Sequence, residues 1–151
     1  MTTDSDAKRE IDRLVGSFYA LFSNGGGTVP RLERIFDLFV PRGIVSRCVD
    51  VAPEVSTLQE FIQPRQLLLT GGRLVDFREA ETGERTLVAG HIAQRVSTYE
   101  KDGVLDGVRF SSRGVKVFQF VETTDGWRIV SVAWDDEREG FAVDGSIMHG
   151  E

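Results

Sequence analysis

Residues 116–136 read KVFQFVETTDGWRIVSVAWDD, and this stretch decides the fold class. Apolar and polar residues alternate on both sides of Asp125-Gly126, which is typical of two antiparallel strands joined by a tight turn. Similar turn signals occur upstream, at Thr82-Gly83 and Asp102-Gly103. Together they predict four long strands, over residues 74–80, 85–100, 109–122 and 127–136.

The residues before position 74 predict mostly helices. Between Ile11 and Phe22 apolar side chains recur every three or four residues, as on one face of an amphipathic helix. Pro30 suits the first turn of a second, short helix, which Pro41 and Gly43 would close. The expected inward face of this helix consists of Leu32, Ile35, Phe36 and Phe39.

A short strand and a third helix are expected next. Residues 44–49 are rich in β-branched side chains and predict a strand, and residues 50–56 predict a loop. Thr57 and Glu60 have the spacing of a capping box, in which each side chain bonds the other residue's backbone N–H. Pro64 removes one helical hydrogen bond, so we expect either a kink or two short helical pieces.

Helices followed by a run of strands favour an α+β fold over one in which helices and strands alternate. We expect three N-terminal helices packed in a strongly curved, mixed or antiparallel sheet. A length of 151 residues suits one core, so a single domain is predicted. This domain covers residues 1–136, and residues 137–151 are expected to form a polar C-terminal tail.

The composition argues against several classes of function. A net charge of -6 leaves no excess of cations to neutralise phosphates, so no nucleic-acid partner is expected. No apolar run is long enough to span a membrane, and residues 1–10 lack the apolar segment of a signal peptide. Cys48 is the only cysteine, so no internal disulfide is expected. These features predict a cytoplasmic protein without a membrane partner.

The order of these elements carries a resemblance to a known family. The residues that carry it are Phe36–Phe39 before the first strand, Ile92–Arg95 with Tyr99, Phe118–Phe120 leading to Gly126–Ile129, and Trp134–Asp136. On them the chain resembles the nuclear transport factor 2-like superfamily, in particular bacterial members without an assigned activity. The resemblance implies a cone-shaped, cystatin-like fold with a pocket between helices and sheet. It also implies a homodimer formed by the outer sheet face.

Ketosteroid isomerases share this fold, but the resemblance does not extend to their chemistry. When the chain is aligned with these enzymes at Phe39 and Phe120, the position of their catalytic base falls on or near Arg47. The tyrosine donor position falls on Phe18 and the acid donor position on Lys116. A guanidinium cannot accept a proton here and a phenyl ring cannot donate one. We therefore do not expect steroid isomerisation.

The same matching implies a pocket for a small, anionic molecule. If Arg47 and Lys116 point inward, the pocket presents two cations to a carboxylate. The alternative is that an acid such as Asp135, Asp37 or Glu60 pairs with them in a structural ion pair. The candidate ligand-binding residues are Phe18, Tyr19, Arg47, Lys116, Phe118 and Asp135.

Asp135 and Tyr19 are two candidates for catalysis. Strict strand alternation puts Asp135 on the face of Trp127 and Ile129, so it is the expected buried carboxylate. It would act as a general base with Tyr19 as hydroxyl partner, or as the counter-ion of a pocket cation. Alternatively, Asp135 and its neighbour Asp136 cap the end of the strand in water.

The two histidines give weaker signals. His91 shares a strand face with Arg95 and Tyr99, and we expect that face to be the outer one. The opposite face, with Ile92, Gln94, Val96 and Thr98, is the expected interior. His149 lies in the tail, and no histidine, cysteine or carboxylate set has metal-ligand spacing. No metal and no cofactor are expected.

Three functions therefore remain open. The first is non-catalytic binding of a small molecule, which the pocket residues favour slightly. The second is a lyase, isomerase or cyclase that uses Asp135, Tyr19 or His91. The third is a homodimeric assembly module without an active pocket, because the alternation of Val117, Gln119 and Val121 would leave apolar surface on the outer sheet face.

Overall fold

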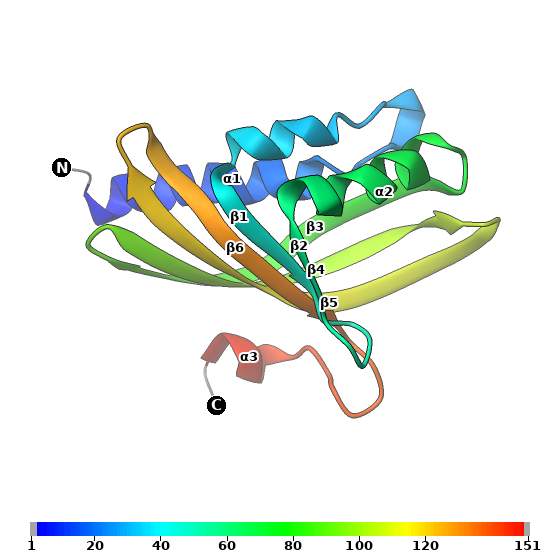
Figure 1. Ribbon diagram of the computed structural model, residues 1–151. Helices are drawn as coiled ribbons and strands as arrows, with labels where there is room; N and C mark the ends of the chain where they lie inside the picture. The colour runs from blue at the N-terminus through cyan, green and yellow to red at the C-terminus, as the bar shows by residue number, and fades with distance from the viewer. Residues whose placement is uncertain (1–2, 150–151) are drawn as a thin grey trace.

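Six strands form one curved, mixed sheet, and the N-terminal helices lie on one of its faces (Figure 1). This computed structural model describes residues 3–149. The strand order is β2-β1-β6-β5-β4-β3, in which β1 and β6 run parallel and the other neighbours antiparallel. The predicted α+β class is confirmed. The strands are β1 (Phe39–Arg47), β2 (Glu54–Thr57), β3 (Leu74–Ala89), β4 (Ile92–Leu105), β5 (Val108–Thr123) and β6 (Gly126–Asp136).

The first helix is the amphipathic one that the sequence predicts. Thr3 accepts a hydrogen bond from the backbone N–H of Asp6 at its start, and the apolar stripe is buried against the sheet. Within residues 3–149 no helix is long and apolar enough to cross a membrane. The helices are α1 (Asp4–Ala20), η1 (Gly25–Gly27), η2 (Leu32–Asp37), α2 (Leu58–Thr70) and α3 (Gly145–His149).

The capping box at the start of α2 is confirmed. The Thr57 N–H donates to Glu60 Oε1 over 2.9 Å, and the Glu60 N–H donates to Thr57 Oγ1 over 3.2 Å. The helix then continues through Pro64 as one element, rather than as two short pieces. β2 directly precedes it and replaces part of the expected loop.

The second helix is shorter and tighter than expected. It is a 3₁₀-helix, in which residues three apart lie on the same face, so Leu32 and Ile35 are both buried. Phe36 is one residue further on and is 45% exposed, which corrects its predicted inward position. Phe39 is buried, but it is the first residue of β1.

Two of the three predicted turns lie elsewhere. The β3–β4 turn contains Gly90, with φ of 63°, and Thr82-Gly83 is instead a bulge inside β3. The β4–β5 turn is at Asp106-Gly107, where both φ angles are positive, as a type I′ turn requires, and Asp102-Gly103 lies within β4. The third turn, just before Gly126, is confirmed.

β4 presents to the helices the face that was expected to be outside. Arg95, Ser97 and Tyr99 are almost completely buried, whereas Ile92 is 60% exposed. Hydrophobicity alone favours the reverse orientation. The observed one is stable because the buried polar side chains bond one another, so the cost of removing them from water is offset.

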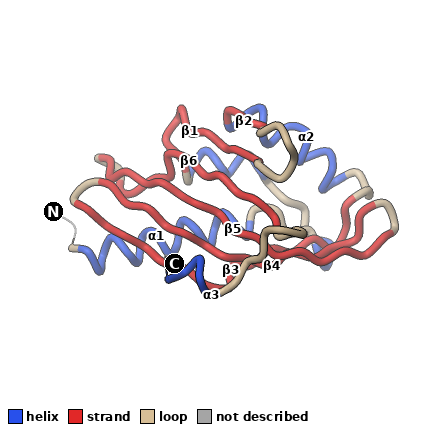
Figure 2. The backbone as a smooth tube through the Cα atoms, turned by 90° about the horizontal axis from the view of Figure 1, so that it is seen from below, coloured by secondary structure: helices blue, strands red, loops and turns tan. Residues whose placement is uncertain are grey.

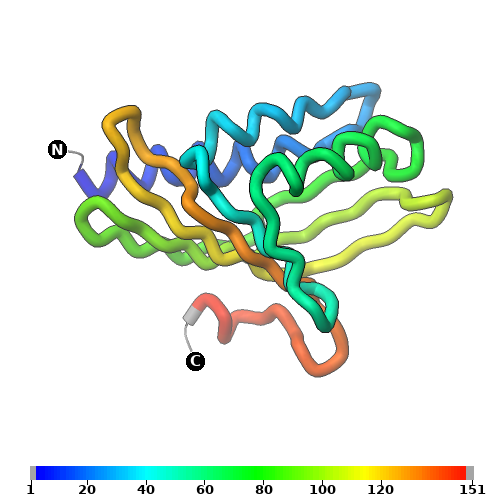
Figure 3. The backbone as a smooth tube through the Cα atoms, viewed as in Figure 1, coloured from blue at the N-terminus to red at the C-terminus, as the bar shows by residue number. Residues whose placement is uncertain are grey.

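The described part of the C-terminal segment lies on the sheet face opposite the N-terminal helices (Figure 2). The helices α1 and α3 therefore lie on opposite sides of the sheet (Figure 3). Val143 is buried there, and its carbonyl accepts a hydrogen bond from Arg113 Nη2 over 2.8 Å. Elsewhere on this outer face Leu87 and Ile92 remain exposed, beside outward-facing Val121.

The close approach of Tyr99 to Gly114 generates a stability prediction. A Cβ at Gly114 would lie 2.1 Å from Tyr99 Oη and 2.6 Å from the Asp135 carbonyl oxygen. Gly114→Ala should therefore destabilise the fold by about 1–3 kcal/mol, as overpacking does. Gly16→Ala is the matched control, because nothing lies within 4 Å of a Cβ there and alanine favours the helix. Urea unfolding measures both, and equal stability of the two variants would contradict the packing described.

Candidate functional site

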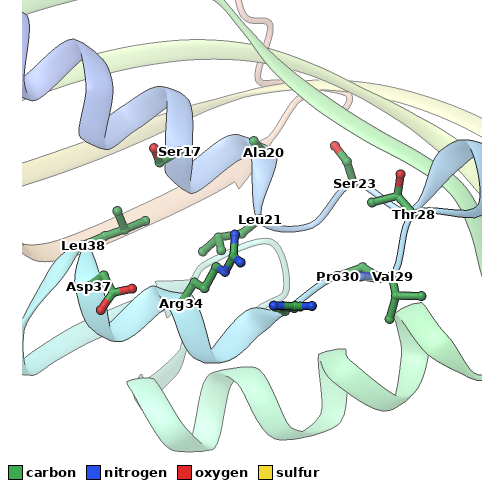
Figure 4. Close-up of a pocket in the computed structure, with 11 residues that line it drawn as sticks. Ser17, Ala20, Leu21, Ser23, Thr28, Val29, Pro30, Arg34, Asp37 and Leu38 are labelled. Carbon is green, nitrogen blue, oxygen red and sulfur yellow. The ribbon is translucent and has the colours of Figure 1, made fainter.

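A groove of about 450 Å³ lies between α1 and η2. Figure 4 shows the Arg34 side chain reaching from η2 toward Leu21, just past the end of α1. Arg31, Arg34 and Asp37 are all exposed there, so water solvates these charges and no packing fixes their geometry. The groove is roomy, but it is the weaker candidate for a specific site.

A second hollow, of about 310 Å³, lies on the outer face of the sheet. Its lining includes Leu87, Ile92 and Val121 and contains no ionisable side chain. An apolar groove of this kind offers nothing that would orient a polar ligand or carry proton transfer.

The candidate site is a third hollow, of about 270 Å³, between the helices and the sheet. We call it the inner cavity. Its aromatic lining consists of Phe18, Phe22, Phe61, Phe77, Phe110 and Trp134, and its charged lining of Arg47, Arg65, Glu79, Lys101 and Lys116. A mainly apolar wall with a few convergent charged groups is the usual composition of a ligand site.

Lys116 is the most buried charged group of the cavity. It is 2% exposed, and its ammonium lies 4.2 Å from the ring centre of Tyr99 and 4.4 Å from that of Trp134. Glu79 supplies the counter-charge, with Oε1 3.3 Å from Nζ. Burial lowers the pKa of Lys116, and Glu79 opposes that shift. Lys116 thus lines the cavity, which is the condition set for an anion pocket, but its partner is none of the acids that were expected.

Arg47 also lines the cavity, at its rim. It is half-buried and its Nη1 pairs with Asp50 over 2.9 Å and with Glu54 over 3.1 Å. The expected partners lie elsewhere: Glu60 is occupied in the capping box, and Asp37 lies in the groove beside η2. Both cations predicted for the pocket are therefore present in it, and both are paired with acids.

Arg65, like Glu79 and Lys101, is a cavity residue that no pattern in the sequence marks. Its guanidinium stacks on Phe61, 3.9 Å from the ring centre, and donates to the Phe61 carbonyl over 3.1 Å. Within residues 3–149 no carboxylate lies within ion-pair distance of it. Burial lowers the pKa of Arg65 to about 10, which leaves it charged at neutral pH.

Asp136, and not Asp135, is the carboxylate that faces the helices. It contacts the Tyr99 hydroxyl and pairs with Lys101 Nζ over 2.9 Å. Asp135 instead bonds Arg138 Nη1 over 2.5 Å on the other side. The cause is a bulge in β6, between the residue that pairs with Phe120 and the residue that pairs with Gln119. Beyond this bulge, the one extra residue reverses the alternation of side chains between the two faces of the sheet.

Tyr19 belongs to a buried polar network beside the cavity. Its hydroxyl lies 2.7 Å from Ser97 Oγ, which donates to Glu81 Oε2 over 2.6 Å. Arg95 Nη2 bonds the other oxygen of Glu81 over 2.6 Å, and Arg95 Nη1 bonds Asp12 over 2.6 Å. Burial raises the pKa of Tyr19, so it stays protonated. Its ring faces the Lys116 ammonium at 5.4 Å, but its hydroxyl is occupied in this network.

The remaining predicted residues lie outside the cavity wall. Phe118 is fully buried in the core, stacked on Phe120 and in edge contact with Phe18. His91 is exposed in the β3–β4 turn and is not among the residues that line the inner cavity. Cys48 is half-buried just after β1.

Burial of Lys116 predicts a pH dependence of stability. The unfolded chain titrates this lysine near 10.5, whereas the folded pKa is lower, so the unfolded state binds more protons in between. The contribution of Lys116 to stability therefore rises as pH rises toward 10.5. We expect urea unfolding, from neutral pH to about pH 10, to show that the free energy of unfolding of the wild type rises relative to that of Lys116→Met. If the wild type instead loses stability relative to the variant over this range, Glu79 raises the pKa of Lys116 by more than burial lowers it.

No family model and no curated protein matches the chain. Solved structures do match it. A nuclear transport factor 2-like superfamily protein from Salmonella enterica has a TM-score of 0.74 at 15% identity, covering 95% of this chain and 99% of that one. A cystatin-like protein from Caulobacter vibrioides gives 0.68 at 16%, covering 95% and 98%. One from Novosphingobium aromaticivorans gives 0.65 at 19%, covering 93% and 84%. The chain thus has the cystatin-like fold of nuclear transport factor 2-like proteins.

Proposed function

We propose that the protein binds a small anionic molecule, a carboxylate on an apolar body, in the inner cavity. The observation that carries this proposal is Arg65. It is a partly buried guanidinium in the cavity wall, held on Phe61, with no acid within ion-pair distance in the described part of the chain, and Glu54 acts on it only from further away. A charge removed from water without a partner is costly, and an anionic ligand would supply that partner.

The other cations of the cavity direct the anion to Arg65. Arg47 is paired with Asp50 and Glu54, and the two lysines are paired with Asp136 and Glu79. Each of these three cations thus has at least one acid in direct contact, whereas in the described part of the chain the guanidinium of Arg65 donates only to the Phe61 carbonyl. A carboxylate can meet such a fork with two parallel hydrogen bonds.

The wall and the volume of the cavity limit the rest of the ligand. Six aromatic rings line it, so the body of the ligand is apolar or aromatic. A volume of about 270 Å³ is just below the range of about 300–1,000 Å³ that is usual for drug-sized ligands. A single ring with a carboxylate, such as benzoate, suits both limits. If side chains filled the interior completely, the structure would instead favour a homodimeric assembly module without an active pocket.

Benzoate binding to the wild type and to Arg65→Gln tests the proposal. Charge-assisted hydrogen bonds contribute about 1.5–3 kcal/mol, so the variant should bind at least about tenfold more weakly. Isothermal titration calorimetry measures both dissociation constants. Arg85→Gln is the matched control, because Arg85 is exposed on the outer side of β3 and should leave the affinity unchanged.

Two results would contradict this function. One is wild-type protein that binds no small aromatic carboxylate at millimolar concentration. The other is an Arg65→Gln variant that is folded, by circular dichroism, and binds benzoate as tightly as the wild type. Benzyl alcohol, which has the same ring without the charge, should bind more weakly than benzoate to the wild type only.

A further inference from the structure

The chain uses lysine sparingly and places it unusually. Lys8, Lys101 and Lys116 are its three lysines, against 15 arginines among 18 basic residues. The exposed cations of the sheet and helices are thus almost all arginines. Two of the three lysines nevertheless line the inner cavity.

Lysine and arginine differ in one property that matters inside a cavity. A guanidinium keeps its proton in proteins, whereas an ammonium can lose one and then becomes a nucleophile. A charge alone would be supplied equally well by arginine, which this chain uses nearly everywhere else. The choice of lysine in the wall of the cavity points to a need for the amine itself.

The groups around Lys116 come from every element packed on it. They are Tyr19 of α1, Glu79 of β3, Tyr99 and Lys101 of β4, and Trp134 and Asp136 of β6. Burial among these rings favours the neutral amine, Glu79 opposes it, and the nearby charge of Lys101 favours it again. A desolvated lysine beside a second cation is a known way to activate an amine for attack on carbonyl groups.

We infer that Lys116 is a covalent site for a carbonyl group, and that the ligand is a small oxo-carboxylate. Its carboxylate is held by Arg65, which rests on the proposed function, and its aldehyde or ketone condenses with Lys116 Nζ. The inner cavity has both groups in its wall. Glu79, 3.3 Å from Nζ, is the group that moves protons in the reaction.

The condensation balances with the groups present. The ammonium of Lys116 gives a proton to Glu79, and the nitrogen lone pair attacks the carbonyl carbon. The carbonyl π electrons move to oxygen, which takes up a proton from the attacking nitrogen, and the intermediate is a neutral carbinolamine. Glu79 returns its proton to the hydroxyl, which leaves as water while the C=N bond forms. One ammonium and one carbonyl thus yield one protonated imine and one water. Lys101 takes no part in the condensation and stays paired with Asp136.

Reductive trapping tests this inference on the unmodified protein. The wild type is incubated at neutral pH with 4-formylbenzoate and cyanoborohydride, which reduces imines and fixes them as stable amines. Intact mass and peptide mapping then give the number and position of the adducts. We expect one adduct, on Lys116, formed at least about tenfold faster than any adduct on Lys8, which is more exposed, or on the α-amino group.

Two comparisons separate a directed reaction from a merely reactive amine. Benzaldehyde lacks the carboxylate and should label Lys116 more slowly than 4-formylbenzoate. Excess benzoate should protect Lys116 by occupying Arg65, and should not protect Lys8. In Lys116→Arg, the fast adduct should disappear while Lys101 stays unlabelled.

The inference and the proposed function can fail separately. If benzoate binds but 4-formylbenzoate labels only Lys8 and the α-amino group of the wild type, the covalent site is overturned and the binding function stands. If benzoate does not bind and Lys116 is labelled equally fast by benzaldehyde, the anion function falls and the covalent site is retained without its carboxylate contact. Labelling of the wild type alone decides the first case, so it does not depend on a variant that folds.

Discussion

The buried pair of Lys116 and Glu79 constrains the whole interior of the cone. Lys116 is only 2% exposed, so its ammonium loses most of its hydration and this loss has to be compensated inside the protein. The surrounding rings and Glu79 do so. Those rings come from α1, β4 and β6, so the helices and the sheet have to meet around this one charge. The inner cavity lies beside the pair, and both Lys116 and Glu79 are in its wall.

A bulge in β6 decides which acid joins this arrangement. Beyond it the alternation of side chains is reversed, so Trp134 and Asp136 face the helices. Asp136 then meets Tyr99 and holds Lys101 as a fixed cation beside Lys116. Without the extra residue Asp135 would occupy that side. One residue of register therefore sets which acid pairs with Lys101 in the cavity wall.

Local signals made much of the fold predictable from sequence. The stripe of α1, the capping box of Thr57 and Glu60, and the run of four long strands depend on short-range spacing. The site depends on long-range pairing, which such patterns do not report. Nothing near Val130 marks a bulge, and Arg95 and Ser97 resemble surface residues until Glu81 is placed beside them. No pattern in the sequence marks Arg65. It stands out only because the acids near the cavity pair with the other cations of its wall.

A crystal structure of the protein with 4-bromobenzoate tests the central claim most directly, since anomalous scattering locates the bromine without assumptions about the fit. We expect one ordered bromine in the inner cavity among the aromatic rings, with the carboxylate within hydrogen-bond distance of Arg65 and the Lys116–Glu79 pair intact. Bromine found only in the groove between α1 and η2 or on the outer sheet face, with Arg65 turned to solvent, would contradict it.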